Sequence, residues 1–290
     1  MREIHTFSIV AYDPDEPAWG IAVASKFLAV GAVVPWARAG AGAVATQSYA
    51  NTTFGPQGLA MMEAGHSAQQ ALDALLEADK GAALRQVGMV DARGGAATFT
   101  GEDCYPWAGG MTGEGFSAQG NLLAGPQVVE AMAEAFTRSR GPLPERLYRA
   151  LLAGDRAGGD RRGRQSAALL VVKEKGGYGG FNDRWIDLRV DNHPDPVPLL
   201  EEMLEMHFLY NEVSPPEERI QLQGEVLQRL QRQMQRLGYY QGEAHGRYDQ
   251  PTREALEKLV LAENMDERTQ LDEGTMDPPA LEFLLRLQAR

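Results

Sequence analysis

The sequence predicts an α+β fold in which helices cover the outer faces of packed β-sheets. Strand-like alternation fills the first fifty residues, helical periodicity then replaces it, and the same order of strands followed by helices repeats. The strict alternation of single strands and helices that builds a doubly wound fold is not seen in this pattern. We therefore expect a layered α+β domain followed by a smaller helical module.

The first predicted strands are short and rich in small residues. Alternation and small apolar runs predict four strands, in HTFSIVAY, WGIAVAS, AVGAVVPWA and GAGAVATQS, the first two joined by the turn DPDEP. Small side chains let sheets or backbones approach closely. Two helices are expected next, in GPQGLAMMEAG and SAQQALDALLEAD, and Ser67 is suited to cap the second.

The second part of the domain repeats this order. RQVGMVDA, AATFTG and FSAQGN predict strands, and two helices are expected over residues 126–137 and 143–153, each with a proline near its start. Two more strands, in SAALLVVKE and WIDLRV, precede a helix over residues 198–210. Strands with helices on both outer faces are the expected result.

A linker and a compositional change mark the end of this domain. In NEVSPPEER, Pro215 and Pro216 cannot continue a helix, and the residues beyond are rich in Gln, Arg, Glu and Leu. Helical patterns on both sides of a Gly-bearing turn, and a final helix in PPALEFLLRLQ, predict a three-helix module. We assign residues 1–212 to the α+β domain, 213–218 to the linker and 219–290 to the module.

Composition narrows the class of function. The 28 lysine and arginine residues against 40 aspartate and glutamate residues give a net charge of −12, which argues against a general nucleic-acid or anionic-membrane binder. Cys104 is the single cysteine, so no intramolecular disulfide forms, and we expect a cytoplasmic protein. Lys26, Pro35 and Arg38 interrupt the apolar stretch over 21–45, which favours buried strands over a membrane span. Small molecules or neutral polymers are the expected partners.

Three further motifs have competing interpretations. Arg161, Arg162 and Arg164 suit a substrate carboxylate or phosphate, or instead a subunit contact or a pair with Asp160, and the loop GGDRRGRQS lacks the ending of a P-loop. DNHPDP offers possible metal ligands, but a turn that precedes the next helix is favoured, so we expect no metal and no cofactor. Cys104 is expected to be a buried structural thiol.

Residues from about 5 to 212 resemble an uncharacterised bacterial and archaeal family of the N-terminal-nucleophile (Ntn) hydrolase superfamily. The resemblance implies a four-layer αββα sandwich, which agrees with the element order above. The matching stretches are TFSIVAYD, GIAVASKFLAVGAVVPWA, GAGAVATQ, RQVGMVDA, TGEDC, QGNLLAG, GGDRRGRQSAALLVV and LRVDNHPDPV.

The resemblance implies that Thr6 is the nucleophile of an amide hydrolase. A threonine hydroxyl needs a base, and an N-terminal residue supplies one in its α-amine, with a pKa of about 7.7–8.0. The resemblance implies that most relatives begin at Met-Thr-Phe-Ser. In this chain MREIH precedes Thr6-Phe7-Ser8, so residues 1–5 must be removed first. Ser8 is a weaker second candidate. The alternative is a non-catalytic binding or scaffold protein with an unprocessed N-terminus.

Other polar residues at strand ends are the expected supporting groups. Lys26 could lower the proton affinity of the nucleophile or hold a substrate carboxylate, or it could simply reach solvent. Gln47 or Asn121 could donate to an oxyanion, while Ser25 and Thr46 could contact substrate, and a structural role is open for each. With Arg161 and Arg162, they suit a small, anionic or cell-wall-derived amide. A homo-oligomer is also expected.

The tail, about 218–288, resembles the small helical peptidoglycan-binding domain. The residues that carry this resemblance are LQRQMQRLGYYQGEAHGRYDQPTREAL. The chain departs from the usual pattern at His245–Gly246, where Asp-Gly is usual, and at Leu259–Val260, where Phe-Gln is usual. We expect the fold of that domain, with either peptidoglycan binding or a docking role.

Overall fold

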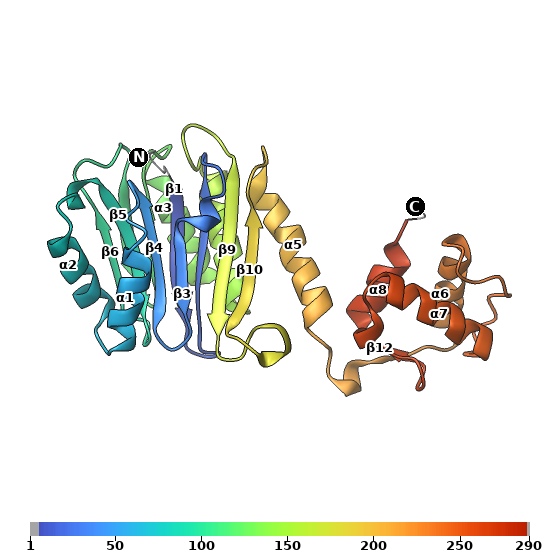
Figure 1. The fold of residues 1–290 in the computed structure, drawn as a ribbon. Helices are drawn as coiled ribbons and strands as arrows, with labels where there is room; N and C mark the ends of the chain where they lie inside the picture. Colours follow the sequence, from blue (N-terminus) through green and yellow to red (C-terminus); the bar gives the residue numbers. More distant parts are fainter. Residues whose placement is uncertain (1–5, 289–290) are drawn as a thin grey trace. The chain divides into compact units, whose positions relative to one another are not determined.

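The computed structural model describes residues 6–288 and divides into two compact units (Figure 1). The first unit ends at Leu204 and the second begins at Glu205, so the division falls inside helix α5 (Pro196–Asn211), ahead of the linker that the sequence predicts at 213–218. Each unit has its own hydrophobic core, and each is described by itself.

The first unit contains two antiparallel sheets. The larger has six strands in the order β10-β9-β2-β1-β8-β7, and the smaller has four in the order β3-β4-β5-β6. The strands of the larger sheet are β1 (Thr6–Asp13), β2 (Ala18–Ser25), β7 (Gly109–Gly113), β8 (Phe116–Gly120), β9 (Ser166–Lys173) and β10 (Arg184–Val190). Those of the smaller sheet are β3 (Pro35–Arg38), β4 (Gly42–Ser48), β5 (Arg85–Asp91) and β6 (Ala96–Thr100).

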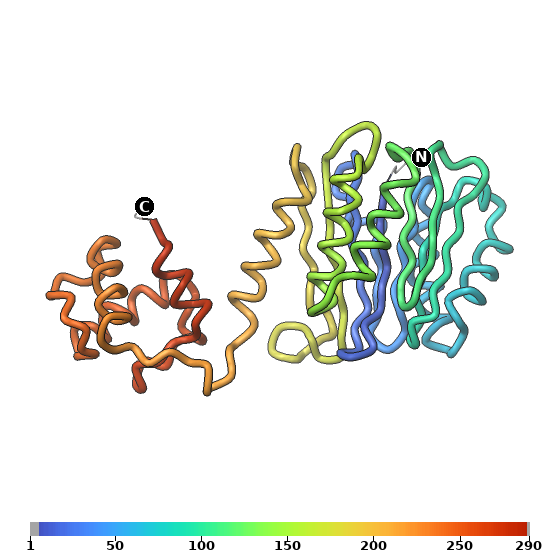
Figure 2. The backbone as a smooth tube through the Cα atoms, turned by 180° about the vertical axis from the view of Figure 1, so that it is seen from behind, coloured from blue at the N-terminus to red at the C-terminus, as the bar shows by residue number. Residues whose placement is uncertain are grey.

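The two sheets pack against each other and carry helices on their outer faces. Helices α1 (Phe54–Glu63) and α2 (Ala68–Ala78) pack on the smaller sheet, and α3 (Gln127–Arg138) and α4 (Leu143–Arg156) pack on the larger one. Figure 2, seen from behind, shows the second pair in front of the larger sheet, running roughly along its strands. The predicted mixture of antiparallel sheets and helices is confirmed, and helices cover each sheet on the side away from the other sheet.

Local signals explain where several elements begin. Ser67 accepts a hydrogen bond from Gln70 N at 3.2 Å while the Gln70 side chain accepts from Ser67 N at 2.9 Å, so the predicted cap of α2 is a complete capping box. The strand predicted in AVGAVVPWA is shorter than expected, because residues Val30–Ala32 form a 3-10 turn before β3 begins at Pro35. Strand β7 (GGMTG), which the sequence does not predict, pairs with β8 at the edge of the larger sheet.

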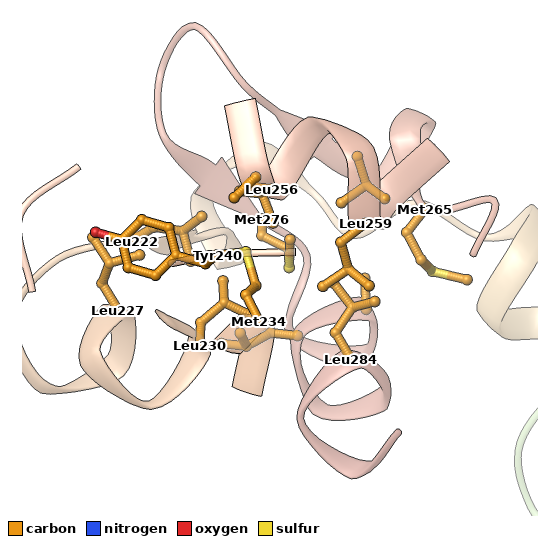
Figure 3. Close-up of a cluster of buried hydrophobic side chains, with 14 residues drawn as sticks. Leu222, Leu227, Leu230, Met234, Tyr240, Leu256, Leu259, Met265, Met276 and Leu284 are labelled. Atoms are coloured by element: carbon orange, nitrogen blue, oxygen red, sulfur yellow. The ribbon is translucent and has the colours of Figure 1, made fainter. Parts of the chain in front are cut away.

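The second unit contains the end of α5 and helices α6 (Gly224–Arg236), α7 (Gln250–Ala262) and α8 (Pro278–Arg286). Three two-residue strands pair in a small antiparallel sheet in the order β11 (Ile220–Gln221), β13 (Thr275–Met276) and β12 (Thr269–Gln270). Figure 3 shows the side chains that fill the core of this unit, among them Leu230, Met234 and Leu256, all fully buried. A buried ion pair between Arg268 and Asp277, 2.6 Å apart, adds to this core, and Asp277 also accepts from Ser214 N at 2.9 Å.

Candidate functional site

Thr6 is the first described residue of β1, a central strand of the larger sheet. It lies opposite Ser25 at the end of β2, and its hydroxyl donates a hydrogen bond to Ser25 Oγ at 3.2 Å. The Thr6 side chain is fully buried. Alternation along β1 places Thr6 and Ser8 on the face that meets the smaller sheet. The predicted removal of residues 1–5 concerns residues outside those that the structure describes.

Six polar side chains fill the space between the two sheets next to Thr6, and we refer to them as the amide cluster. They come from β1, β4, β5 and β8 and from the residue after β8, and each is 0% exposed. Buried polar groups are tolerated when they are hydrogen-bonded to one another. The members of the amide cluster are Ser8, Gln47, Gln86, Ser117, Gln119 and Asn121.

Ser8 joins the two sheets through this cluster. Its hydroxyl donates to Gln47 Oε1 on the opposite sheet at 2.6 Å and accepts from Gln119 Nε2 on the neighbouring strand at 2.7 Å. Ser117 Oγ in turn donates to Gln119 Oε1 at 2.7 Å. The Ser8 hydroxyl is thus fixed as both a donor and an acceptor, which leaves it without a base to remove its proton.

Gln86 connects the two amides that the sequence singles out. Its Oε1 accepts from Gln47 Nε2 at 2.9 Å and from Asn121 Nδ2 at 2.8 Å, while its own Nε2 donates to Gly120 O at 2.7 Å. Gln47 Nε2 also lies 3.4 Å from the Thr6 carbonyl oxygen, and the Asn121 backbone N–H donates to that oxygen at 3.0 Å. Gln47 and Asn121 are therefore brought together beside Thr6, and Gln86, which sequence reasoning missed, orients both.

Two strained residues lie directly after these amides. Ser48 follows Gln47 with φ of 64°, and Leu122 follows Asn121 with φ of 51°. Residues other than glycine rarely adopt this left-handed conformation, and such strain concentrates at functional sites. The backbone therefore turns sharply at the points where the chain leaves Gln47 and Asn121.

An ion pair supports the loop that follows Gln47. Arg85 Nε donates to Asp79 Oδ2 at 2.7 Å, and Arg85 also donates to the Tyr49 carbonyl at 2.6 Å. The Arg85 guanidinium lowers the pKa of Asp79 to about 2, with help from hydrogen bonds from Gly81 and Asn51. The charged pair thus remains intact at neutral pH and holds the loop in place.

The remaining strand-end residues point elsewhere. Lys26 is exposed, and its ammonium donates to the Arg164 carbonyl at 3.1 Å. No hydrogen bond from Lys26 to Thr6 is found among residues 6–288. Thr46 donates to the Asn51 carbonyl at 3.2 Å. Of the predicted supporting groups, the structure therefore gathers Ser25, Gln47 and Asn121 around Thr6 and leaves Lys26 and Thr46 with other partners.

The arginine loop is largely neutralised by aspartates. Arg162 pairs with Asp160 at 2.8 Å, and Asp160 also accepts from the backbone N–H groups of Lys26 and Arg162 at 2.9 Å each. Arg164 contacts Asp155 at 2.7 Å and Asp195 at 3.2 Å, and these carboxylates raise its pKa. Arg161 is exposed. The Asp160 pair considered from the sequence is therefore present for Arg162.

A cavity of about 430 Å³ opens between this loop and the strand ends. Ser25, whose hydroxyl accepts from Thr6, lines it together with Phe7, Asp155, Arg164 and Ser166. The cavity therefore borders the hydrogen-bonded partner of Thr6 and contains charges of both signs.

Two other predicted features have structural surroundings. His193 Nδ1 accepts from Asp195 N at 3.1 Å, which closes the turn before α5. Cys104 is buried, and burial raises the pKa of its thiol, so the thiolate is disfavoured. Within residues 6–288, no group of three or more His, Cys, Asp or Glu side chains is arranged to hold a metal ion. In the same range no helix has the length and apolar character needed to cross a membrane.

Each of the two units matches a known protein family. Residues 210–284 match the family described as "Putative peptidoglycan binding domain". Anbu from Hyphomicrobium sp. strain MC1 aligns over 73% of this chain and 99% of its own at 10% identity, but its TM-score of 0.32 is too low to support an inference. None of the curated proteins matches the chain.

The first unit matches a protein family and a solved structure from that family. Residues 6–200 match the "Family of unknown function (DUF1028)". The crystal structure of a protein of that family from Silicibacter pomeroyi is 34% identical, with a TM-score of 0.64, over 70% of this chain and 89% of its own. The chain therefore belongs to the family of unknown function DUF1028 and carries a match to a peptidoglycan-binding domain family after it.

Proposed function

We propose that the first unit is an N-terminal-nucleophile amide hydrolase and that the Thr6 hydroxyl is its nucleophile once the preceding residues are removed. The observation that carries this proposal is the position of Thr6 at the tip of a central strand, bonded to Ser25 and beside the buried amides of Gln47 and Asn121. A helix pair, two facing sheets and a second helix pair also support an αββα sandwich of the Ntn-hydrolase kind.

The chemistry requires a free α-amine at Thr6. That amine takes the hydroxyl proton as Thr6 Oγ1 attacks the substrate carbonyl, and it then gives the proton to the leaving amine as the C–N bond breaks. The acyl group is left as an ester on Thr6. Water attacks this ester with the same amine as base, which releases a carboxylic acid and restores the hydroxyl.

Amide side chains beside the nucleophile suit the developing oxyanion. Asn121 Nδ2 and Gln47 Nε2 both donate to Gln86 Oε1, and Gln47 Nε2 also lies 3.4 Å from the Thr6 carbonyl oxygen. We assign the oxyanion to these donors, because preorganised amides in a buried setting stabilise negative charge strongly. Gln86 would hold both in place without touching the substrate.

A small, anionic or cell-wall-derived amide is the proposed substrate class. Arg164 lines the cavity beside Ser25 but pairs with Asp155 and Asp195, so exposed Arg161 of the same loop is the arginine that we propose meets a substrate carboxylate. The match of residues 210–284 to a peptidoglycan-binding family supports a cell-wall origin for the substrate. Ser25, Thr46, Arg161 and Arg162 remain our proposed substrate contacts.

A variant that begins Met-Thr6 tests this proposal, since methionine removal then exposes the threonine. We expect this variant to hydrolyse members of a panel of N-acyl amino acids and stem-peptide amides, and the same variant with Thr6→Ala to be inactive. Circular dichroism would show that both are folded. Equal turnover by the Thr6→Ala variant would exclude Thr6 as nucleophile.

One observation favours the alternative of a non-catalytic binding protein. Lys26 donates to the Arg164 carbonyl at 3.1 Å, and Gln47 Nε2 bonds Gln86 at 2.9 Å, so both predicted catalytic groups already have partners. If no amide is cleaved by the Met-Thr6 variant, a ligand that binds the cavity beside Ser25 becomes the object to identify.

A further inference from the structure

The outer face of α6 carries an exposed row of arginines. Arg229, Arg232 and Arg236 are exposed and lie along one side of the helix, at spacings of three and four residues. With Gln233 and Leu285 of α8 they line a groove of about 310 Å³, which we call the arginine groove. Arg236 also donates to the Leu287 carbonyl at the end of α8, which holds its guanidinium at the groove.

These arginines have no carboxylate partner among the described residues, unlike Arg253 and Arg286 of the same unit. Arg253 pairs with Asp272 at 2.6 Å, and Arg286 pairs with Glu282 at 3.2 Å. Among the described residues, no ion pair involves Arg229, Arg232 or Arg236. The positive charge of the arginine groove is therefore not neutralised by the described chain, although the protein as a whole has a charge of −12.

The arrangement also weakens the helix that carries it. Arg232 lies three residues after Arg229 and four before Arg236, and like charges at these spacings each destabilise a helix by about 0.2–0.5 kcal/mol. Glu225 is the one carboxylate in α6, and it makes no ion pair with Arg229 in the described structure. A helix optimised for stability alone would alternate charges here, so the row indicates an external anion.

We propose that the arginine groove binds a peptide with several carboxylates, of the class found in peptidoglycan stem peptides. This inference rests on the proposed cell-wall role of the second unit. The Cα atoms of successive arginines are about 4.5–6 Å apart along the helix axis, since each residue rises about 1.5 Å. Each guanidinium can bind one carboxylate through two parallel hydrogen bonds, and half-buried Leu285 offers an apolar contact to methyl groups between them.

Nucleic acid is the less favoured partner for the same surface. Backbone phosphates would be attracted to three arginines, but the chain around them is acidic, and a nucleic-acid site usually extends as a basic patch over a whole face. The arginine row is confined to one helix, which disfavours a nucleic-acid site. Duplex DNA is used as a second probe to test this alternative.

The experiment uses the full chain and two charge-matched double variants. Arg229→Gln/Arg232→Gln removes two groove charges and leaves Arg236 to hold α8, while Arg253→Gln/Arg286→Gln removes two paired charges from the same unit. Each is titrated calorimetrically with the soluble stem tripeptide Ala-γ-Glu-diaminopimelate and tested for retention on purified sacculi. Thermal unfolding checks that both variants fold.

We expect the groove variant to bind the tripeptide about tenfold more weakly than the unsubstituted chain, with the control variant within about twofold. If the groove variant loses tripeptide binding but the unsubstituted chain is not retained on sacculi, the result supports the arginine groove and contradicts the cell-wall role. If the groove variant is retained on sacculi as fully as the unsubstituted chain, the result supports the cell-wall role and contradicts the arginine groove. An unsubstituted chain that binds duplex DNA through these arginines and ignores the tripeptide would overturn the inference.

Discussion

Two parts of the inter-sheet core of the first unit are equally buried and chemically opposite. Around β2 and β9 the space between the sheets is filled by apolar side chains such as Ile21, Val23 and Leu170. Around β8 and the start of β1 the same space is filled by the amide cluster. Both parts join the same two sheets, so the difference does not follow from the fold.

The two parts also differ in what their burial contributes to stability. Apolar burial stabilises a core by about 25 cal/mol per Å², whereas a buried polar group must recover the cost of leaving water through its hydrogen bonds. A core selected for stability alone would be apolar on both sides. The polar side is the one beside Thr6 and beside the strained residues Ser48 and Leu122, which is the pattern expected of a functional site.

The largest expected effect is a loss of kcat when Asn121 of the amide cluster is replaced. In the Met-Thr6 variant, Asn121→Ala removes a proposed oxyanion donor and should lower kcat by about 10²–10³. Ser117→Ala removes a hydroxyl from the same cluster, where it donates to Gln119, and should leave kcat close to its starting value. Steady-state kinetics on the best amide of the panel measure both. Unchanged kcat for Asn121→Ala would argue against its role in catalysis.

Stability should fall next when the cluster is broken at its centre. Gln86→Leu removes the acceptor shared by Gln47 and Asn121 and the donor to the Gly120 carbonyl, and we expect it to lower the free energy of unfolding by about 2–4 kcal/mol. Urea unfolding measures this loss. A change below about 0.5 kcal/mol would mean that the buried amides find other partners.

A combined substitution separates the effect of the buried amides on stability from their proposed effect on activity. Gln47→Leu, Gln86→Leu and Asn121→Leu together remove donors and acceptors at once, so few groups remain unsatisfied and the triple variant should be more stable than Gln86→Leu alone. The same triple variant should have no hydrolase activity. A triple variant that is active as well as stable would contradict a functional reason for the polar side.

The amide cluster also needs the space that the absent side chain of Gly88 leaves for Gln119. A Cβ added at Gly88 would lie 2.1 Å from Gln119 Oε1, and Gln119 is held by Ser8 and Ser117. Gly88→Ala should therefore destabilise the protein by about 1–3 kcal/mol. The double variant Gly88→Ala/Gln119→Ala relieves the overlap, and differential scanning calorimetry should show that the two substitutions are not additive.

The smallest expected effect is a pH dependence at the loop after Gln47. The pKa of Asp79 is lowered from 3.8 to about 2 by Arg85, so the stabilising pair is complete above about pH 4 and is lost as pH falls through 2. After allowance for solvent screening, the loss is about 1–2 kcal/mol. Asp79→Asn should lack this dependence, and urea unfolding between pH 2 and 5 would compare the two proteins. Parallel pH profiles would contradict the assignment.

The elements of the fold were largely predictable because local patterns specify them. Ser67 and Gln70 mark the start of α2, and alternation marks β1. Strand β7 was not predictable, since three of the five residues of GGMTG are glycines, which are depleted in strands, and the segment pairs with β8 at the sheet edge. The 3-10 turn at Val30–Ala32 likewise interrupts an apolar run that alone predicts a strand.

The site was predictable only in part. Gln47 could be identified as a polar residue at the end of the largely apolar strand β4, and Asn121 as a polar residue directly after β8. Gln86 could not, because β5 is buried on both faces and its alternation therefore carries no signal of which residues meet the other sheet. The partner of Lys26 depends on how the distant arginine loop folds back, which no local pattern specifies.

The most direct test of Thr6 as an N-terminal nucleophile is to measure the mass and N-terminal sequence of the protein fraction that hydrolyses an amide. The chain is expressed with residues 1–5 in place, active fractions are collected, and each is analysed by intact-mass spectrometry and Edman degradation. We expect activity to follow the fraction whose chain begins at Thr6. Full activity in a fraction whose chain still carries the residues before Thr6 would contradict it.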